Sequence, residues 1–346
     1  MATTVKTKLT ELLGIRAPVV SAAMVYASSA KLAVEVTRAG GFGTFGVAGF
    51  TQEKLREELT FARTSLPTLG DELLPIGCGF LGWMLDLKED EFRPLLDIVL
   101  ESGVRALWLS FGNNLGRWVQ YIRDSTANAP GGRRPLVFVQ VTTVEEAVCA
   151  ANEWKVDVII AQGNESGGHG RSSAPSTMVL LSEILASLPG DDAPPILVAG
   201  GITNGTQIAA YLTAGASGAV LGTRFVLTPE STYSVAQKNV LKGAKSSQTV
   251  RSLAFDQARG TNNWPEGIDG RGIRNEIVKD VESGVDEKTT QEKYRAAVQA
   301  QDTNYMVIWS GQGISLINDI KPAREVVEEL HEGIVRALRR AQHLLA

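Results

Sequence analysis

The feature that most constrains the fold is a regular alternation of short apolar segments, most of them ending near a glycine, with longer amphipathic segments. The apolar segments are hydrophobic throughout instead of at every second position, as strands covered on both faces are. Strands that alternate with helices in this way are typical of parallel β/α units. Eight strands are predicted, at residues 17–24, 41–47, 75–81, 105–111, 135–141, 156–163, 195–201 and 218–225.

The segments between the predicted strands carry helix start and stop signals. The stretch TTVEEAVCAANEW begins with a threonine cap and early carboxylates, and TNGTQIAAYLTAGA ends at Gly215. Eight strand–helix units in about 230 residues fit a (β/α)8 TIM barrel better than an open doubly wound sheet. The sequence therefore predicts an α/β protein built on a TIM barrel.

The pattern changes after Pro229, where polar helical segments and a loop-rich passage replace the apolar strands. We expect residues 231–320 to form a smaller helical and loop-rich domain on the substrate side, over the active-site end of the barrel. The last segment, 321–346, is amphipathic, so we expect it to pack on the outer ring of helices. The barrel is thus predicted to comprise residues 1–230 together with 321–346.

Composition narrows the class of partner. The net charge is −4 with no dense block of Lys or Arg, which argues against nucleic acid as a partner and favours a small molecule. No apolar run approaches the roughly 18 residues of a membrane span. Two cysteines give no disulfide framework, so a reducing compartment is expected. The cytoplasm is the default location, with organelle import and homo-oligomer formation left open.

Two glycine-rich strand ends are candidates for phosphate binding. Gly200 and Gly201 follow the seventh predicted strand, and Gly222 and Thr223 end the eighth. The loops after these two strands often bind phosphate in TIM barrels. Glycine lets backbone N–H groups approach a phosphate closely, and a following helix start adds a favourable dipole. The alternative is that these glycines only form tight turns.

The sixth predicted strand ends in the polar stretch AQGNESGGHG, which is a candidate for catalysis. Gln162 offers a donor and an acceptor suited to a flavin's pyrimidine edge or ribityl hydroxyls. Gly167 and Gly168 allow a tight fold before His169. The other two histidines, His331 and His343, lie in the terminal amphipathic segment, so His169 is the candidate imidazole for chemistry near neutral pH.

Other kinds of site lack their signatures. The sequence has no HExxH, no CxxC and no Asp/His cluster at ligand spacing, so no metal site is expected. No GxSxG stands at a predicted strand end, which removes the usual hydrolase nucleophile. Redox chemistry supplied by a bound cofactor remains.

With these motifs the chain resembles the nitronate monooxygenase family, the flavin enzymes also called 2-nitropropane dioxygenases. The motifs on which this resemblance rests are APVVSAAM, AGGFGTFG, the specific AQG-to-GGH signature, AGGI, LGTRF and, near the C-terminus, IWSGQG. The chain departs from the family at Ala23, where proline is common, at Ser166, where alanine is usual, and at Arg171, where HGR replaces HRG.

The resemblance implies FMN as the cofactor. Met24, with Ala23 before it, would back the isoalloxazine; Gln162, Gly167 and Gly168 would contact it, and the phosphate would lie on Gly200, Gly201, Gly222 and Thr223. His169 would face the substrate. The implied reaction is oxidation of alkyl nitronates, and of nitroalkanes if His169 accepts a proton, by O2 to carbonyl compounds and nitrite through an anionic flavin semiquinone.

Three alternatives stay open from the sequence. The nearest keeps the barrel and FMN but oxidises NAD(P)H, as quinone reductases and enoyl reductases do. The second is a phosphate-binding barrel without redox chemistry, such as a lyase or isomerase. The third is a binding protein without catalytic activity.

Overall fold

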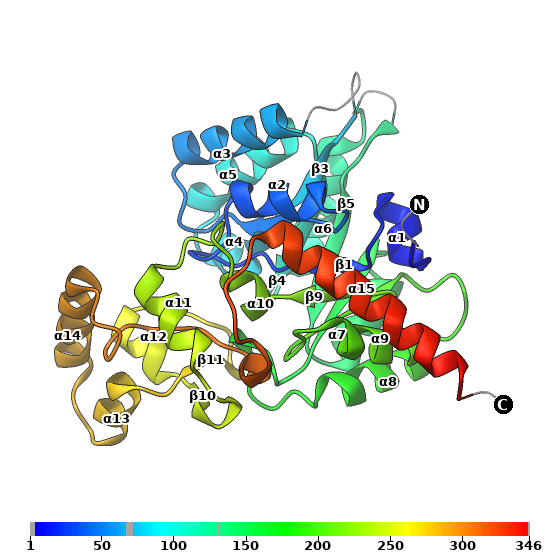
Figure 1. The fold of residues 1–346 in the computed structure, drawn as a ribbon. Helices are drawn as coiled ribbons and strands as arrows, with labels where there is room; N and C mark the ends of the chain where they lie inside the picture. Colours follow the sequence, from blue (N-terminus) through cyan, green and yellow to red (C-terminus); the bar gives the residue numbers. More distant parts are fainter. Residues whose placement is uncertain (1–3, 67–71, 130–131, 345–346) are drawn as a thin grey trace.

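The computed structural model describes residues 4–66, 72–129 and 132–344. An eight-stranded parallel sheet forms the body, in the order β1-β9-β8-β6-β5-β4-β3-β2 (Figure 1). A parallel bridge between Val20 of β1 and Phe42, just before β2, brings the sheet close to a full ring. The (β/α)8 barrel prediction is confirmed. Its strands are β1 (Val19–Ser21), β2 (Thr44–Gly46), β3 (Leu74–Leu81), β4 (Val104–Ser110), β5 (Leu136–Val141), β6 (Val158–Gln162), β8 (Ile196–Ala199) and β9 (Gly218–Leu221).

The continuous apolar character of the strands follows from burial on both faces. In β6, Val158 and Ile160 pack with side chains of the other strands inside the barrel, whereas Ile159 and Ala161 pack against the surrounding helices. Leu9 of α1 (Lys8–Leu13) joins the interior cluster, so this short helix closes one end of the barrel. The interior is therefore filled by side chains, as in TIM barrels generally.

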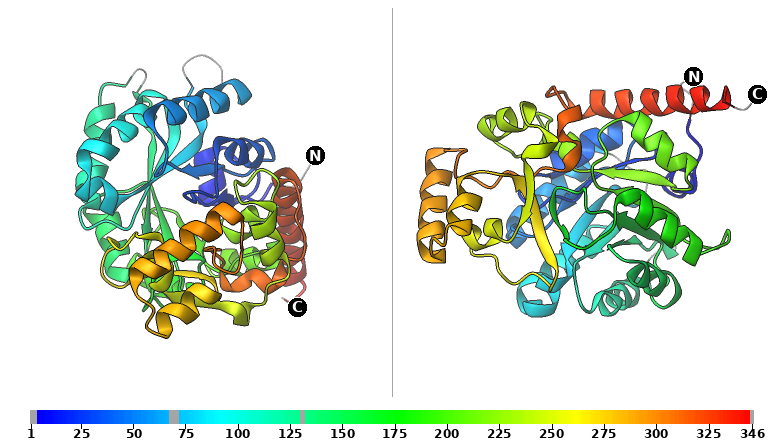
Figure 2. Two further views of the ribbon diagram at one scale, coloured as in Figure 1. Left: turned by 90° about the vertical axis from the view of Figure 1, so that its left-hand side faces the viewer. Right: turned by 90° about the horizontal axis from the view of Figure 1, so that it is seen from below.

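The helices that follow the strands form the outer ring. They are α2 (Ala30–Arg38), α3 (Gln52–Ser65), α4 (Gly82–Leu87), α5 (Glu89–Glu101), α6 (Leu115–Thr126), α7 (Val144–Asn152), α8 (Thr177–Ser187), α9 (Gly205–Thr213) and the short α10 (Thr223–Val226). The C-terminal helix α15 (Ala323–Gln342) packs against α9 and α2 along its buried stripe of Val326, Leu330 and Ile334 (Figure 2). This helix therefore lies on the outer ring of helices.

The chain between α10 and α15, residues 227–322, is called the appended segment below. It carries a second hydrophobic cluster that includes Phe255, Ile277 and Ile308. Its elements are α11 (Val235–Lys242), β10 (Thr249–Ser252), α12 (Ala254–Arg259), β11 (Ile268–Ile273), α13 (Glu276–Glu282), α14 (Glu287–Ala300) and two 3-10 helices, Ser246–Gln248 and Gln312–Leu316. This segment lies beside the barrel, and α14 is on the opposite side of the molecule from both termini (Figures 1 and 2).

This segment contains a small sheet as well as the expected helices. Strands β10, β11 and β7 (Gly168–Arg171) form a three-stranded antiparallel sheet. In its register Gly270 of β11 lies opposite His169 of β7. The sheet fastens the loop after β6 to the appended segment. Sequence reading treated both β7 and β11 as loop, because GHGR and IDGRGI each contain two glycines among polar residues and their strands form by pairing with distant segments.

Candidate active site

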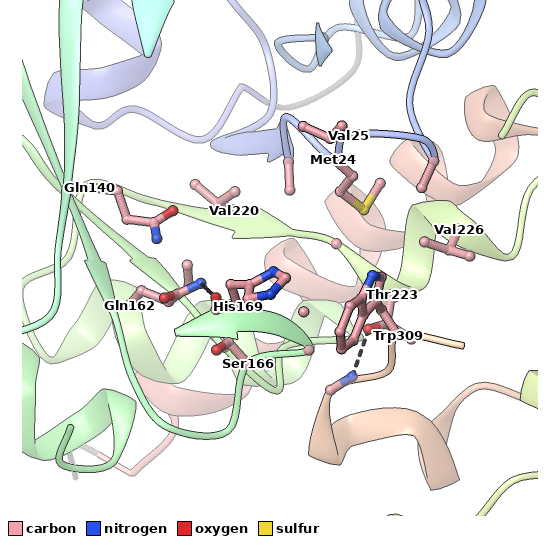
Figure 3. A pocket seen from close by; sticks show the side chains of 18 of the residues that line it. Met24, Val25, Gln140, Gln162, Ser166, His169, Val220, Thr223, Val226 and Trp309 are labelled. Carbon is pink, nitrogen blue, oxygen red and sulfur yellow. Dashed lines mark hydrogen bonds between the residues drawn. The ribbon is translucent and has the colours of Figure 1, made fainter. Parts of the chain in front are cut away.

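A cavity opens at the carboxyl ends of the barrel strands and is covered partly by the appended segment. Figure 3 shows Met24, Gln162, His169 and Thr223 around it. Nine of the ten residues predicted for the site line this cavity: Met24, Gln162, Gly167, Gly168, His169, Gly200, Gly201, Gly222 and Thr223. Ala23 does not, because its methyl group faces Gly79 of β3.

Two glycine loops after β8 and β9 form one wall of the cavity. Gly200 and Gly201 adopt φ angles of 118° and 68°, which side chains other than glycine rarely tolerate. The backbone N–H groups of Gly201, Gly222 and Thr223 donate no hydrogen bond within the described parts of the chain. These donors are therefore free to bind an anionic group. The space in front of them is open because Gly200, Gly201 and Gly222 have no side chains.

A third glycine loop from the C-terminal region completes this wall. The Gly311 N–H donates to the Thr223 hydroxyl over 2.9 Å, a bond drawn in Figure 3. A Cβ on Gly313 would overlap the carbonyl oxygen of Gly201, so the loops touch without intervening side chains. Both Gly311 and Gly313 line the cavity. Sequence reasoning noted their segment, IWSGQG, but did not assign it to the site.

Two glutamines supply polar atoms on the opposite side. Gln162 Nε2 donates to the His169 carbonyl oxygen over 3.2 Å, while its Oε1 is buried without a partner. Gln140, at the end of β5, has a buried Nε2 without a partner. Buried polar atoms are normally paired, so an unpaired donor and an unpaired acceptor in one cavity fit the polar edge of a heterocycle. Sequence reasoning missed Gln140.

The loop between β6 and β7 is held rigidly. The Glu165 carboxylate accepts from the Thr177 N–H and hydroxyl, each over 2.8 Å. Arg251 donates to the Ser166 hydroxyl over 2.9 Å and pairs with Asp269 over 2.7 Å. Ser166, one of the departures from the family pattern, thus has a structural partner in the appended segment.

Arg171, the arginine that stands one place later than in the family pattern, lies outside the cavity. It donates to the Thr142 hydroxyl and to Glu146, each over 3.0 Å. An ion pair with Glu146 occupies it, so it is not placed to bind an anion in the cavity.

His169 pairs with a carboxylate that sequence reasoning did not find. Its Nε2 lies 2.9 Å from both carboxyl oxygens of Asp256 on α12. Asp256 is 1% exposed and also accepts from the Thr261 hydroxyl over 2.8 Å. Burial lowers the pKa of His169 below its ordinary value of 6.5, and Asp256, which acts in the opposite direction, does not offset this effect. The imidazole is therefore neutral near pH 7.

Aromatic side chains enclose the imidazole. Trp264 stacks on His169 with ring centroids 3.5 Å apart and planes 10° apart, and Trp309 lies edge-on at 5.0 Å. Trp83 packs against Trp264 at 5.3 Å. The indole N–H groups of Trp83 and Trp264 are both buried without an acceptor. Sequence reasoning considered Trp83 and Trp309 but not Trp264, which lies in the loop-rich passage before β11.

Within the three described ranges no group of three or more His, Cys, Asp or Glu side chains is placed to hold a metal ion. No helix in that same portion of the chain has the length and apolar character of a membrane span.

Comparison with known proteins gives a consistent result. A family model described as nitronate monooxygenase matches residues 97–333. The nitronate monooxygenase npaC of Metarhizium robertsii is 32% identical, over 91% of this chain and 90% of that protein. A nitronate monooxygenase of Neurospora crassa is 30% identical, over 95% of this chain and 92% of that protein.

Solved structures of the same fold are also similar. The nitroalkane oxidase of Streptomyces ansochromogenes superposes with a TM-score of 0.78 at 25% identity, covering 96% of this chain and 99% of that one. FabK from Thermotoga maritima gives a TM-score of 0.79 at 24% identity, covering 99% and 100%, and this second likeness concerns the fold alone.

Proposed function

The chain belongs to the nitronate monooxygenase family, and from this premise we propose that it binds FMN in the strand-end cavity and oxidises alkyl nitronates with O2 to carbonyl compounds and nitrite. Membership makes the chain a flavin-dependent oxidoreductase acting on nitro compounds. The observation that supports the finer proposal is the meeting of three glycine loops and His169 in one cavity. Neutral nitroalkanes are proposed as additional substrates.

The residues present fit FMN. The free backbone N–H groups of Gly201, Gly222 and Thr223 would hold the phosphate. The unpaired Gln140 Nε2 and Gln162 Oε1 would meet the polar edge of the flavin ring. Met24, which lines the cavity beside Gly222, would back the ring. FMN, when bound, supplies the electron acceptor and the reaction with O2.

The aromatic enclosure would hold the substrate and exclude water. A nitronate carries two oxygen atoms, and the unpaired indole N–H groups of Trp83 and Trp264 are donors that need acceptors. A nitronate is already an anion, so it needs no base. A neutral nitroalkane must first lose a proton from carbon, and the neutral imidazole of His169 is the base at hand.

The test is to supply an alkyl nitronate to the FMN-loaded protein in air and to measure nitrite and O2. The proposal expects nitrite release with O2 consumption and no need for NADH or NADPH. If nitronate gives no nitrite while anaerobic NADH rapidly bleaches the flavin, the chain is a reductase on the same fold. A protein that stays colourless after incubation with FMN would instead favour a lyase, an isomerase or a binding protein.

A further inference from the structure

The pairing of His169 with Asp256 restricts where the imidazole carries its proton. A carboxylate only accepts hydrogen bonds, so the nitrogen that faces it must donate. Nε2 lies 2.9 Å from both oxygens of Asp256. Because a neutral imidazole has a single N–H, placing that proton on Nε2 leaves the lone pair on Nδ1.

Nδ1 is available to a ligand. It forms no hydrogen bond to any described residue, yet it is not one of the fully buried polar atoms that lack a partner. It therefore keeps accessible surface, and His169 lines the cavity. Trp264 covers one face of the ring, so the imidazole is held between that indole and the carboxylate of Asp256.

Asp256 is itself held in place. The Thr261 hydroxyl donates to its Oδ1 over 2.8 Å, and the Arg259 guanidinium lies 4.0 Å from the same oxygen. The backbone N–H of Thr261 also donates to the Asp256 carbonyl oxygen over 2.9 Å. The charged groups that act on His169 are Asp256 and Arg259 on α12 and Arg251 on β10. Asp256 is the one among them that contacts the ring.

We propose that Asp256 is a positioning residue that fixes His169 in its Nε2–H tautomer and so presents the Nδ1 lone pair to the substrate as the proton acceptor. This inference rests on the proposed function for the identity of the substrate. The proton on the nitroalkane carbon moves to Nδ1, and the C–H electron pair stays on the substrate as nitronate. The imidazolium that forms keeps its Nε2–H bonded to Asp256, whose negative charge balances it.

The tautomer can be read without any turnover. Histidine nitrogen shifts in the 15N NMR spectrum distinguish Nδ1–H from Nε2–H, and the chain has only three histidines. The spectrum of His169→Asn identifies the His169 signals by their loss. We expect the wild-type signals to show protonated Nε2 and unprotonated Nδ1 above the pKa of His169. We expect Asp256→Asn to shift the population toward Nδ1–H, since an amide can donate to Nε2.

Activity gives a second readout. Asp256→Asn is expected to lower kcat/KM for a neutral nitroalkane by about 10²-fold, a loss typical of general-base catalysis, and to lower it only a few-fold for the preformed nitronate. Removing the carboxylate also removes what raises the pKa of His169, so the acid limb of the nitroalkane pH profile should move to lower pH. Asp280→Asn is the matched control, since Asp280 pairs with Lys293 and Tyr305 away from the cavity.

Two results would overturn the inference: a wild-type spectrum with the proton on Nδ1, or an Asp256→Asn variant with unchanged histidine shifts and an unchanged nitroalkane-to-nitronate ratio. If Asp256→Asn does not fold, the wild-type spectrum decides alone. If the wild type oxidises neither substrate, the proposed function fails, while the spectrum still tests the role of Asp256.

Discussion

Thr223 and Gly311 lie 88 residues apart in the chain and are joined by a hydrogen bond of 2.9 Å from the Gly311 N–H to the Thr223 hydroxyl. The bond ties the IWSGQG segment near the C-terminus to the loop after β9. Because Thr223 also carries a free backbone N–H, the proposed phosphate cradle is assembled from the middle of the chain and its C-terminal part. The proposed FMN site therefore links cofactor binding to docking of the appended segment.

Gly222→Asp is expected to abolish FMN binding. A Cβ at Gly222 would meet only Met24 Sδ at 3.5 Å and Ala22 Cβ at 3.8 Å, so the backbone tolerates a side chain. The loss would come from a carboxylate placed where the phosphate must lie. Gly243→Asp is the control, because Gly243 has the same φ of −98° and open space around it. Flavin content after gel filtration measures the effect, and a Gly222→Asp protein with full flavin would place the phosphate elsewhere.

His169→Asn is expected to leave FMN bound and to reduce turnover of neutral nitroalkanes by about 10²–10⁴-fold, the usual contribution of a general base. Turnover of preformed nitronates should fall much less, because no proton has to be removed. Steady-state nitrite release with each substrate, compared at equal flavin content, measures the difference. Equal losses with both substrates would show that the imidazole does not act as a base.

The pH dependence follows from the direction of the His169 pKa shift. Burial lowers this pKa below 6.5, and only the neutral imidazole accepts a proton. The kcat/KM for a nitroalkane should therefore be constant through neutral pH and fall as the pH drops through the lowered pKa. The kcat/KM for a nitronate should lack this acid limb. A nitroalkane limb centred above pH 6.5 would contradict the assignment.

Trp264→Phe is expected to raise KM for nitronates by about tenfold, equivalent to about 1.4 kcal/mol for one lost hydrogen bond. Phenylalanine keeps an aromatic ring beside His169 and removes the indole N–H together with the pyrrole ring. Trp118→Phe is the control. Trp118 lies on α6, outside the cavity, and its indole N–H donates to Asp86 over 2.8 Å. If the two variants have the same KM as the wild type, the Trp264 N–H does not bind the substrate.

The barrel could be predicted because its signal is local. A parallel strand covered on both faces needs an unbroken apolar run, and most such runs here end at a glycine. The glycines and His169 could be placed in one cavity for the same reason, since all carboxyl ends of a barrel face the same way. The observed strands are mostly shorter than predicted: β1 covers Val19–Ser21 of the predicted 17–24.

The rest of the site depends on contacts between distant segments. Asp256 and Trp264 reach His169 from α12 and the loop after it, and no local pattern marks an acidic residue there as a histidine partner. Strand β7 forms because β11 pairs with it about 100 residues later. Ala23 was predicted because it precedes Met24, but its methyl group points to Gly79 of β3, away from the cavity.

The most direct test of the account is the visible absorption spectrum of the protein after incubation with FMN and gel filtration, followed by anaerobic addition of an alkyl nitronate. We expect a yellow protein with stoichiometric FMN, whose flavin bands change on addition of nitronate alone, without NADH or NADPH. A protein that remains colourless, or a bound flavin whose spectrum nitronate leaves unchanged, would contradict it.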